Sequence, residues 1–176
     1  MPKTITVDLL SQSSISKAIE EIEQYKRWVN RKSAELAEAL SRVGIYEASF
    51  RFAGAQYDGL NDVQVETTKD NTGSYVITAH GKAVAFIEFG AGVYHNTTEY
   101  PLPRPAGIVG IGEYGRKHGK RRGWAYPIEK GLGSSGVPLN HKWAFTRGNP
   151  RAMPMYYASK EMQEKLLTVA REVFGN

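Results

Sequence analysis

An apolar stripe along one long predicted helix constrains the fold of this chain more than any other feature. Its members recur every seventh residue, at Ile15, Ile22, Val29, Leu36 and Val43. Because this spacing keeps apolar side chains on one helical face, it predicts a helix over residues 14–43, which Gly44 would end. Such a helix is about 45 Å long, more than a body of this size needs to cover its own sheet. Its far part, around Trp28 and Arg31, is expected to pack either on another subunit or within its own chain.

Shorter elements are predicted after this helix. Residues 46–52, 63–68 and 74–80 alternate apolar with polar side chains and are expected to be strands of an antiparallel meander, with a hairpin at 69–73. An apolar segment at 82–89 is expected to form one or two helical turns, and 143–145 a short strand. Pro154 begins a final amphipathic helix that Gly175 ends.

These elements predict one α+β domain over residues 1–176. In it, a long N-terminal helix and a C-terminal helix pack on one antiparallel β-meander. The body comprises residues 14–90 and 143–175. Residues 91–142 have no long periodic element and are expected to be an extended arm or loop inserted before the last strand.

The arm carries the net charge of the chain. Residues 91–142 contain eight Lys or Arg and three acidic residues, whereas the remainder has fifteen of each sign. The basic cluster is interleaved with aromatic rings and comprises Arg116, Lys117, Lys120, Arg121, Arg122, Trp124 and Tyr126. Such a cluster suits binding to DNA phosphates, with stacking on unpaired bases. Contact with an acidic neighbouring subunit, or a solvated run of charge, explains it equally well.

No set of residues predicts catalysis or metal binding. The chain has no cysteine, and its histidines do not pair at ligand spacing; they are His80, His95, His118 and His141. The glycine pattern at 110–115 matches a dinucleotide fingerprint in letters but lacks the strand before it and the helix after it. We therefore expect no enzyme activity, no cofactor and no metal. No apolar run reaches the roughly 20 residues that cross a bilayer, so no membrane association is expected.

Glu88 is the one acid in a strongly apolar setting. Burial would raise its pKa as in a catalytic acid. A structural role is the better interpretation, because a carboxylate beside Gly90 and Gly92 can accept neighbouring backbone N–H groups and fix a tight turn. Arg147 or Arg151 is a second expected partner.

Two blocks resemble a known family. The first block, residues 85–92, contains Ile87-Glu88-Phe89-Gly90 at the end of the apolar segment. The second block, residues 146–158, contains Met153-Pro154-Met155-Tyr156-Tyr157-Ala158 and leads into the last helix. In this order, behind a long helix and alternating strands, they resemble the gene-product-ten-like family of tailed-phage neck, head–tail connector and tail-completion proteins. The resemblance covers roughly residues 15–90 and 143–174. Met155 stands where the family usually has Phe, and the stretch 91–142 is longer than the family's usual connection.

The resemblance implies a structural virion protein without catalytic residues, in which Ile87, Glu88, Phe89, Gly90, Pro154 and Tyr156 are structural. It implies a homo-oligomeric ring in the neck, with six copies favoured over twelve, through which the genome passes. The implied neighbours are adjacent connector, portal-side and tail-tube or tail-terminator proteins, and the arm would contact genomic DNA or a neighbouring subunit. Assembly would take place in the host cytoplasm. The alternative function is a nucleic-acid-binding protein that uses residues 116–126.

Overall fold

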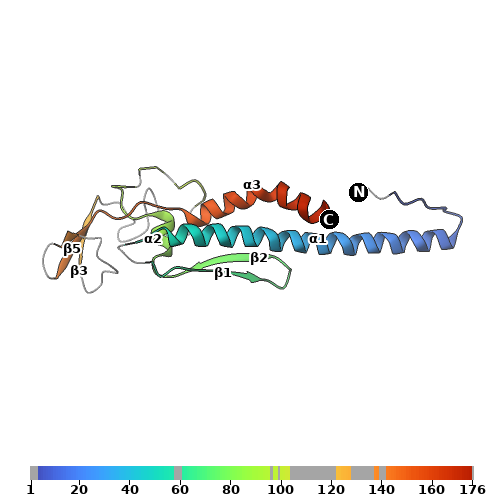
Figure 1. Cartoon of the computed structure of the whole chain (residues 1–176), viewed down its shortest axis with the longest axis horizontal. Coiled ribbons are helices and arrows are strands. Elements are labelled where there is room, and N and C mark those ends of the chain that lie inside the picture. Colours follow the sequence, from blue (N-terminus) through green and yellow to red (C-terminus); the bar gives the residue numbers. More distant parts are fainter. Residues whose placement is uncertain are drawn as a thin grey trace.

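The molecule is elongated along its first helix (Figure 1). The structure is a computed structural model that describes residues 4–57, 61–95, 97–98, 100–103, 122–127, 137–138 and 142–175. Helix α1 (Gln12–Ala53) is flanked by α3 (Pro154–Gly175) and by the hairpin of β1 (Gln64–Lys69) and β2 (Tyr75–His80). The short elements are α2 (Val84–Phe89), β3 (Trp124–Pro127), β4 (Val137–Pro138) and β5 (Trp143–Thr146). The α+β class is as predicted.

Helix α1 is longer than predicted at both ends. Ser11 caps its start, where the side-chain oxygen accepts the Ser14 amide at 3.3 Å. Gly44 does not end the helix but lies buried within it. A side-chain carbon there would lie 2.4 Å from Cδ1 of Ile77 and 2.6 Å from Sδ of Met162. This glycine therefore lets β2 and α3 approach α1 closely, and the predicted stop was wrong.

Residues 46–52 form the last turns of α1, so the strand predicted there is wrong. Ala48 and Phe52 are buried, whereas Tyr46 and Phe50 are exposed and stack on each other with ring centroids 6.4 Å apart. Positions two apart share a face in a strand but lie on opposite faces of a helix, so only Ala48 and Phe52 of the alternating set face the core. The apolar periodicity that precedes them continues into this segment and makes it helical.

The hairpin predicted at 69–73 is confirmed. Strands β1 and β2 pair antiparallel from Gln64 opposite His80 to Lys69 opposite Tyr75. Asp70 organises the turn, since its carboxylate accepts the amides of Thr72 at 2.9 Å and Ser74 at 2.8 Å. Hydrogen bonds to the Thr72 hydroxyl and the Ser74 amide also lower the pKa of Asp70. The sheet on α1 is thus a two-stranded hairpin rather than a three-stranded meander.

A second small sheet involves the segment predicted to be an arm. Strand β5 is its middle strand and pairs antiparallel with β3 on one side and β4 on the other. The expected strand at 143–145 is confirmed, but β3 and β4 lie within 91–142, where no regular structure was expected. Strands of two and four residues leave no periodicity to recognise in the sequence.

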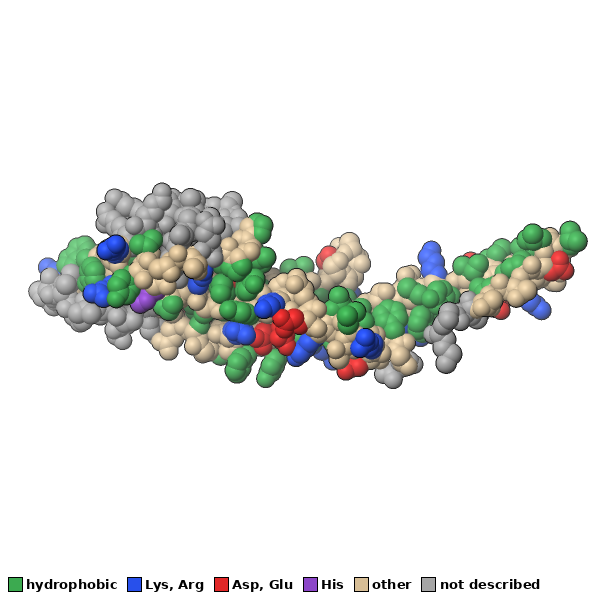
Figure 2. Space-filling model, turned by 90° about the horizontal axis from the view of Figure 1, so that it is seen from above, with side chains coloured by type: hydrophobic (Ala, Val, Ile, Leu, Met, Phe, Trp, Pro, Cys, Tyr) green, Lys and Arg blue, Asp and Glu red, His purple; other side chains and the backbone are tan. Residues whose placement is uncertain are grey.

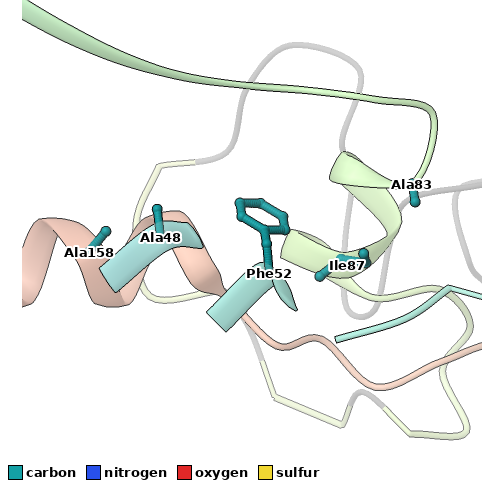
Figure 3. Packing of buried hydrophobic residues seen from close by; sticks show 5 residues of the cluster. All are labelled: Ala48, Phe52, Ala83, Ile87 and Ala158. Carbon is teal, nitrogen blue, oxygen red and sulfur yellow. The ribbon is translucent and has the colours of Figure 1, made fainter. Parts of the chain in front are cut away.

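The core lies at the C-terminal end of α1 (Figure 3). Its fully buried side chains come from α1, α2, α3 and the residue before α2, and are Ala48, Phe52, Ala83, Ile87 and Ala158. Half-buried side chains of the hairpin, including Val65 and Ala79, pack against them. This burial packs α2 against the C-terminal end of α1 and the start of α3.

The first turns of α1 project beyond the rest of the body (Figure 1). Helix α3 ends beside Trp28, whose ring meets that of Phe174 edge to face at 5.8 Å. Packing within the chain therefore covers the stripe as far as Trp28. The Asp8 amide binds Ser14 Oγ at 2.9 Å, and residues 4–6 line a shallow groove with Lys17 and Ala18.

Candidate functional site

The two sequence blocks that carry the resemblance meet at the start of α3. Helix α2 brings the first block into place, and its own start is held by Asp62. The carboxylate of Asp62 accepts the amides of Lys82 at 2.8 Å and Ala83 at 2.9 Å, and these bonds lower its pKa, the Ala83 bond most. Asp62 thereby fixes the start of α2, and Gly90, with φ 74°, ends the helix.

Backbone hydrogen bonds join the second block to the first. Ala91 and Asn149 exchange two bonds of 3.0 and 3.1 Å, and the Ala152 amide donates to the Ile87 carbonyl at 2.8 Å. The Asn149 side chain donates to the carbonyl of Phe86 at 2.9 Å. Gly148 has φ +85°, and a side-chain carbon there would lie 1.8 Å from the Ala91 oxygen. Only glycine allows this approach.

Glu88 caps α3 from outside the helix. One oxygen, Oε2, accepts the Met155 amide at 2.8 Å. The other, Oε1, accepts the Tyr156 amide at 3.1 Å and the Tyr100 hydroxyl at 2.5 Å. The first amides of a helix have no partner within it, and Pro154, at the first position, has no N–H. We call this arrangement of Glu88, Tyr100, Met155 and Tyr156 the Glu88 cap.

Burial and hydrogen bonding shift the pKa of Glu88 in opposite directions. Glu88 is 3% exposed. Loss of hydration raises its pKa above the ordinary value, whereas the bonds from Tyr100, Met155 and Tyr156 lower it in part. Burial, followed by the bond to Glu88, also raises the pKa of Tyr100, which therefore remains a hydroxyl donor. The dipole of α3 favours a carboxylate at this end of the helix.

The structure brings all six predicted structural residues together. Ile87 is buried in the core, Gly90 ends α2 with φ 74°, and Pro154 is buried at the start of α3. Phe89 meets Tyr100 at 4.9 Å between ring centroids, and Tyr100 meets Tyr156 at 6.1 Å. Sequence reasoning missed Tyr100 and the contacts of Asn149, because no sequence pattern points to either.

The predicted partners of Glu88 need correction. Backbone amides do bind it, but they belong to Met155 and Tyr156, more than sixty residues along the chain. Arg147 instead lies over the ring of Tyr94, 4.7 Å from its centroid, and donates to its hydroxyl at 3.0 Å. Arg151 donates to the carbonyl and hydroxyl oxygens of Thr98. These arginines thus hold the segment after α2 against the second block.

Most of the predicted basic cluster lies outside the described residues, namely Arg116, Lys117, Lys120 and Arg121. Arg122 is exposed just before β3, and Trp124 lies in β3 opposite Thr146. Tyr126 pairs with Ala144 through its backbone, and its side chain is outside the described part. The glycine pattern at 110–115 is outside it too.

Comparisons of the chain with protein-family models, with curated proteins and with solved structures find no significant match. Within the described residues, no group of three or more acidic or histidine side chains could hold a metal ion. No helix in this part is both long and apolar enough to cross a bilayer. The Glu88 cap joins three segments of the chain, namely α2, the segment that contains Tyr100 and the start of α3. Both carboxylate oxygens of Glu88 accept hydrogen bonds.

Proposed function

We propose that this protein is a structural subunit of the neck of a tailed bacteriophage, where identical copies form a ring in the head–tail connector. The genome passes through this ring, which contacts portal-side and tail-side proteins. Assembly takes place in the host cytoplasm, and the protein then resides in the virion. Six copies are favoured over twelve.

The observation that carries this proposal is the row of exposed aliphatic side chains on the projecting end of α1. Ile19 is 53% exposed and Ile22 56% exposed, on a helix that extends past α3 and the hairpin (Figure 1). Branched aliphatic side chains in a row on a free helix cost solvation free energy in a monomer. A subunit made for assembly has such a surface and covers it with a neighbour.

The Glu88 cap supports the same proposal from a second direction. The two blocks that resemble the phage family are far apart in sequence, yet they form one hydrogen-bonded junction between α2 and α3. Among the described side chains, Glu88 is the buried acid, and it serves to fix the start of a helix. A junction of this kind gives a rigid subunit, which a ring requires.

The test is the assembly state of the full chain. Size-exclusion chromatography with light scattering, from micromolar to millimolar protein, should show a closed oligomer whose mass stops growing with concentration. Negative-stain images should show rings. A chain that remains monomeric across this range, or that forms open fibres of unlimited length, contradicts the proposal.

A further inference from the structure

Two apolar surfaces of the chain lie too far apart on α1 to meet within one copy. We propose that the projecting face of α1 binds the apolar groove between α1, β2 and α3 of a second copy, so that the subunits join head to tail. The projecting face, the N-terminal stripe, consists of Ile15, Ile19, Ile22 and Tyr25. This inference rests on the proposed function and specifies the contact that closes the ring.

The N-terminal stripe continues a face that the chain covers elsewhere. Its four side chains are 37 to 56% exposed, and neighbours three or four apart on a helix lie about 5–6 Å from each other. The same heptad spacing leads on to Val29 and Leu36, which are half-buried. Figure 2 shows hydrophobic side chains along the projecting end of the molecule. The N-terminal stripe is therefore the exposed continuation of a helical face that is packed further along α1.

The groove that would receive the stripe is also apolar. It has a volume of about 420 Å³, nearly three times the roughly 150 Å³ of an apolar cavity that holds a benzene molecule. There is room for two or three aliphatic side chains. Val76, at its wall, is 49% exposed. The lining residues are Ala37, Leu40, Ser41, Tyr75, Val76, Ile77, Met155, Ala158, Ser159 and Met162.

The rigidity of α1 excludes binding within one chain. Ile22 and Leu40 lie on the same helix, about 27 Å apart along its axis at 1.5 Å per residue. The stripe cannot fold back onto its own groove. A contact between two different surfaces is heterologous, and repetition of such a contact closes a ring when the rotation per subunit divides a full turn.

The size of the stripe suits a specific interface. Leu9 and Leu10, just before α1, are 81 and 98% exposed. Complete burial of an aliphatic side chain corresponds to about 100 Å², so with these two leucines the surface offers roughly 400 Å² of apolar area. One side of a standard interface buries about 800 Å², of which somewhat more than half is apolar. The stripe and the two leucines together supply most of that apolar share.

Variants of exposed or half-buried residues test the contact without removing core side chains. The stripe variant is Ile19→Glu with Ile22→Glu; the groove variants are Val76→Glu on β2 and Ser159→Arg on α3. Each should weaken self-association at least tenfold, roughly the effect of losing one buried aliphatic contact. The matched control is Leu167→Glu, a 68% exposed leucine of α3 outside the groove, which should assemble like the natural chain.

A mixture of the stripe variant with a groove variant tests whether the subunits join head to tail. The stripe variant keeps its groove, and a groove variant keeps its stripe, so an equimolar mixture should form a dimer and nothing larger by light scattering. This dimer also shows that both variants are folded. Groove variants that assemble normally would show that two stripes pair with each other, or that another surface is used, and would overturn the inference.

The inference and the proposed function fail in different ways. If the natural chain forms rings and the stripe variant forms the same rings, the contact is wrong and the proposed function stands. If the natural chain never associates, the proposed function fails at its own test before any variant is compared.

Discussion

The two halves of α1 have similar apolar stripes and very different surroundings. Toward its C-terminal end, α3, α2 and the hairpin cover the helix, and Ala48 and Phe52 are fully or almost fully buried. Before Trp28 the same helix projects, and Ile22 is more than half exposed (Figures 1 and 2). The difference teaches that periodicity identifies an apolar face but not what covers it. Stability should reside in one half and association in the other.

Truncation of one side chain in each half gives the largest expected contrast. Phe52→Ala should lower the free energy of unfolding by about 3–5 kcal/mol, because it leaves a cavity among tightly packed neighbours. Ile22→Ala, the matched variant in the projecting half, should change it by less than about 0.5 kcal/mol. Urea denaturation followed by circular dichroism, at a concentration low enough to keep the chain monomeric, measures both. Equal losses would mean that the projecting half is covered in the monomer.

The next contrast separates backbone strain from close approach. Gly148 and Gly73 both have positive φ, of 85° and 88°, but only Gly148 lies against another segment. Gly73→Ala should cost about 1–2 kcal/mol from the left-handed backbone alone. Gly148→Ala should cost more, since its new carbon would have to displace Ala91 and break the pairing with Asn149.

Denaturation midpoints of the two glycine variants provide the measurement. Gly73 has open space around it, so Gly73→Ala is the control that measures the cost of positive φ without a steric clash. Equal costs would show that the junction between the two blocks yields easily, and that the covered half of the molecule is less rigid than its hydrogen bonds indicate.

Much of the covered half follows from the sequence. Both long helices, the hairpin, the short α2 and the strand β5 were predicted, because each has periodicity or a terminal residue that acts locally. The strand at 46–52 was wrong because the alternation predicts one buried face, whereas in the helix only Ala48 and Phe52 face the core. Gly44 was wrongly predicted to end the helix. A glycine is needed there because Ile77 and Met162 approach α1 too closely for a larger side chain.

The candidate site was predictable only in part. Glu88 stood out because its neighbours in sequence are apolar, and the two blocks stood out by their order. Its partners did not, because a capping side chain from another element leaves no spacing signal in the chain. Tyr100 lies in a segment without periodicity, and no local rule connects it with α3.

Replacement of Glu88 tests how much the Glu88 cap contributes to the stability of the covered half. Glu88→Gln should cost about 1–3 kcal/mol, because the amide nitrogen cannot accept a hydrogen bond, whereas both oxygens of the carboxyl group accept one. Burial holds the pKa of Glu88 above its ordinary value of 4.5. The folded state therefore binds the proton more tightly than the unfolded chain, and this stabilisation is complete below the unfolded pKa and lost as pH rises through the folded pKa.

The Glu88→Gln variant has no carboxyl group that could titrate at this position. The difference in free energy of unfolding between the natural chain and Glu88→Gln should therefore shrink as pH rises from about 4.5. Denaturation series at several pH values measure it, with Glu164→Gln, an exposed acid of α3, as the control. A difference that grows with pH would mean that the three hydrogen bonds outweigh burial and that the pKa is lowered.

The smallest predicted effect concerns the tyrosine of the Glu88 cap. Tyr100→Phe keeps the ring contacts with Phe89 and Tyr156 but removes the hydroxyl that donates to Glu88, at a cost of about 1 kcal/mol. Tyr94→Phe is the control, since its hydroxyl is exposed and binds Arg147. Because the Tyr100 bond lowers the pKa of Glu88, its loss should also move the pH-dependent window upward. In the Glu88→Gln background the cost of Tyr100→Phe should fall, since neighbouring groups in one network are not additive. An unchanged cost would show that Tyr100 stabilises the body through its ring alone, and that the cap consists of Glu88 and the two amides of α3.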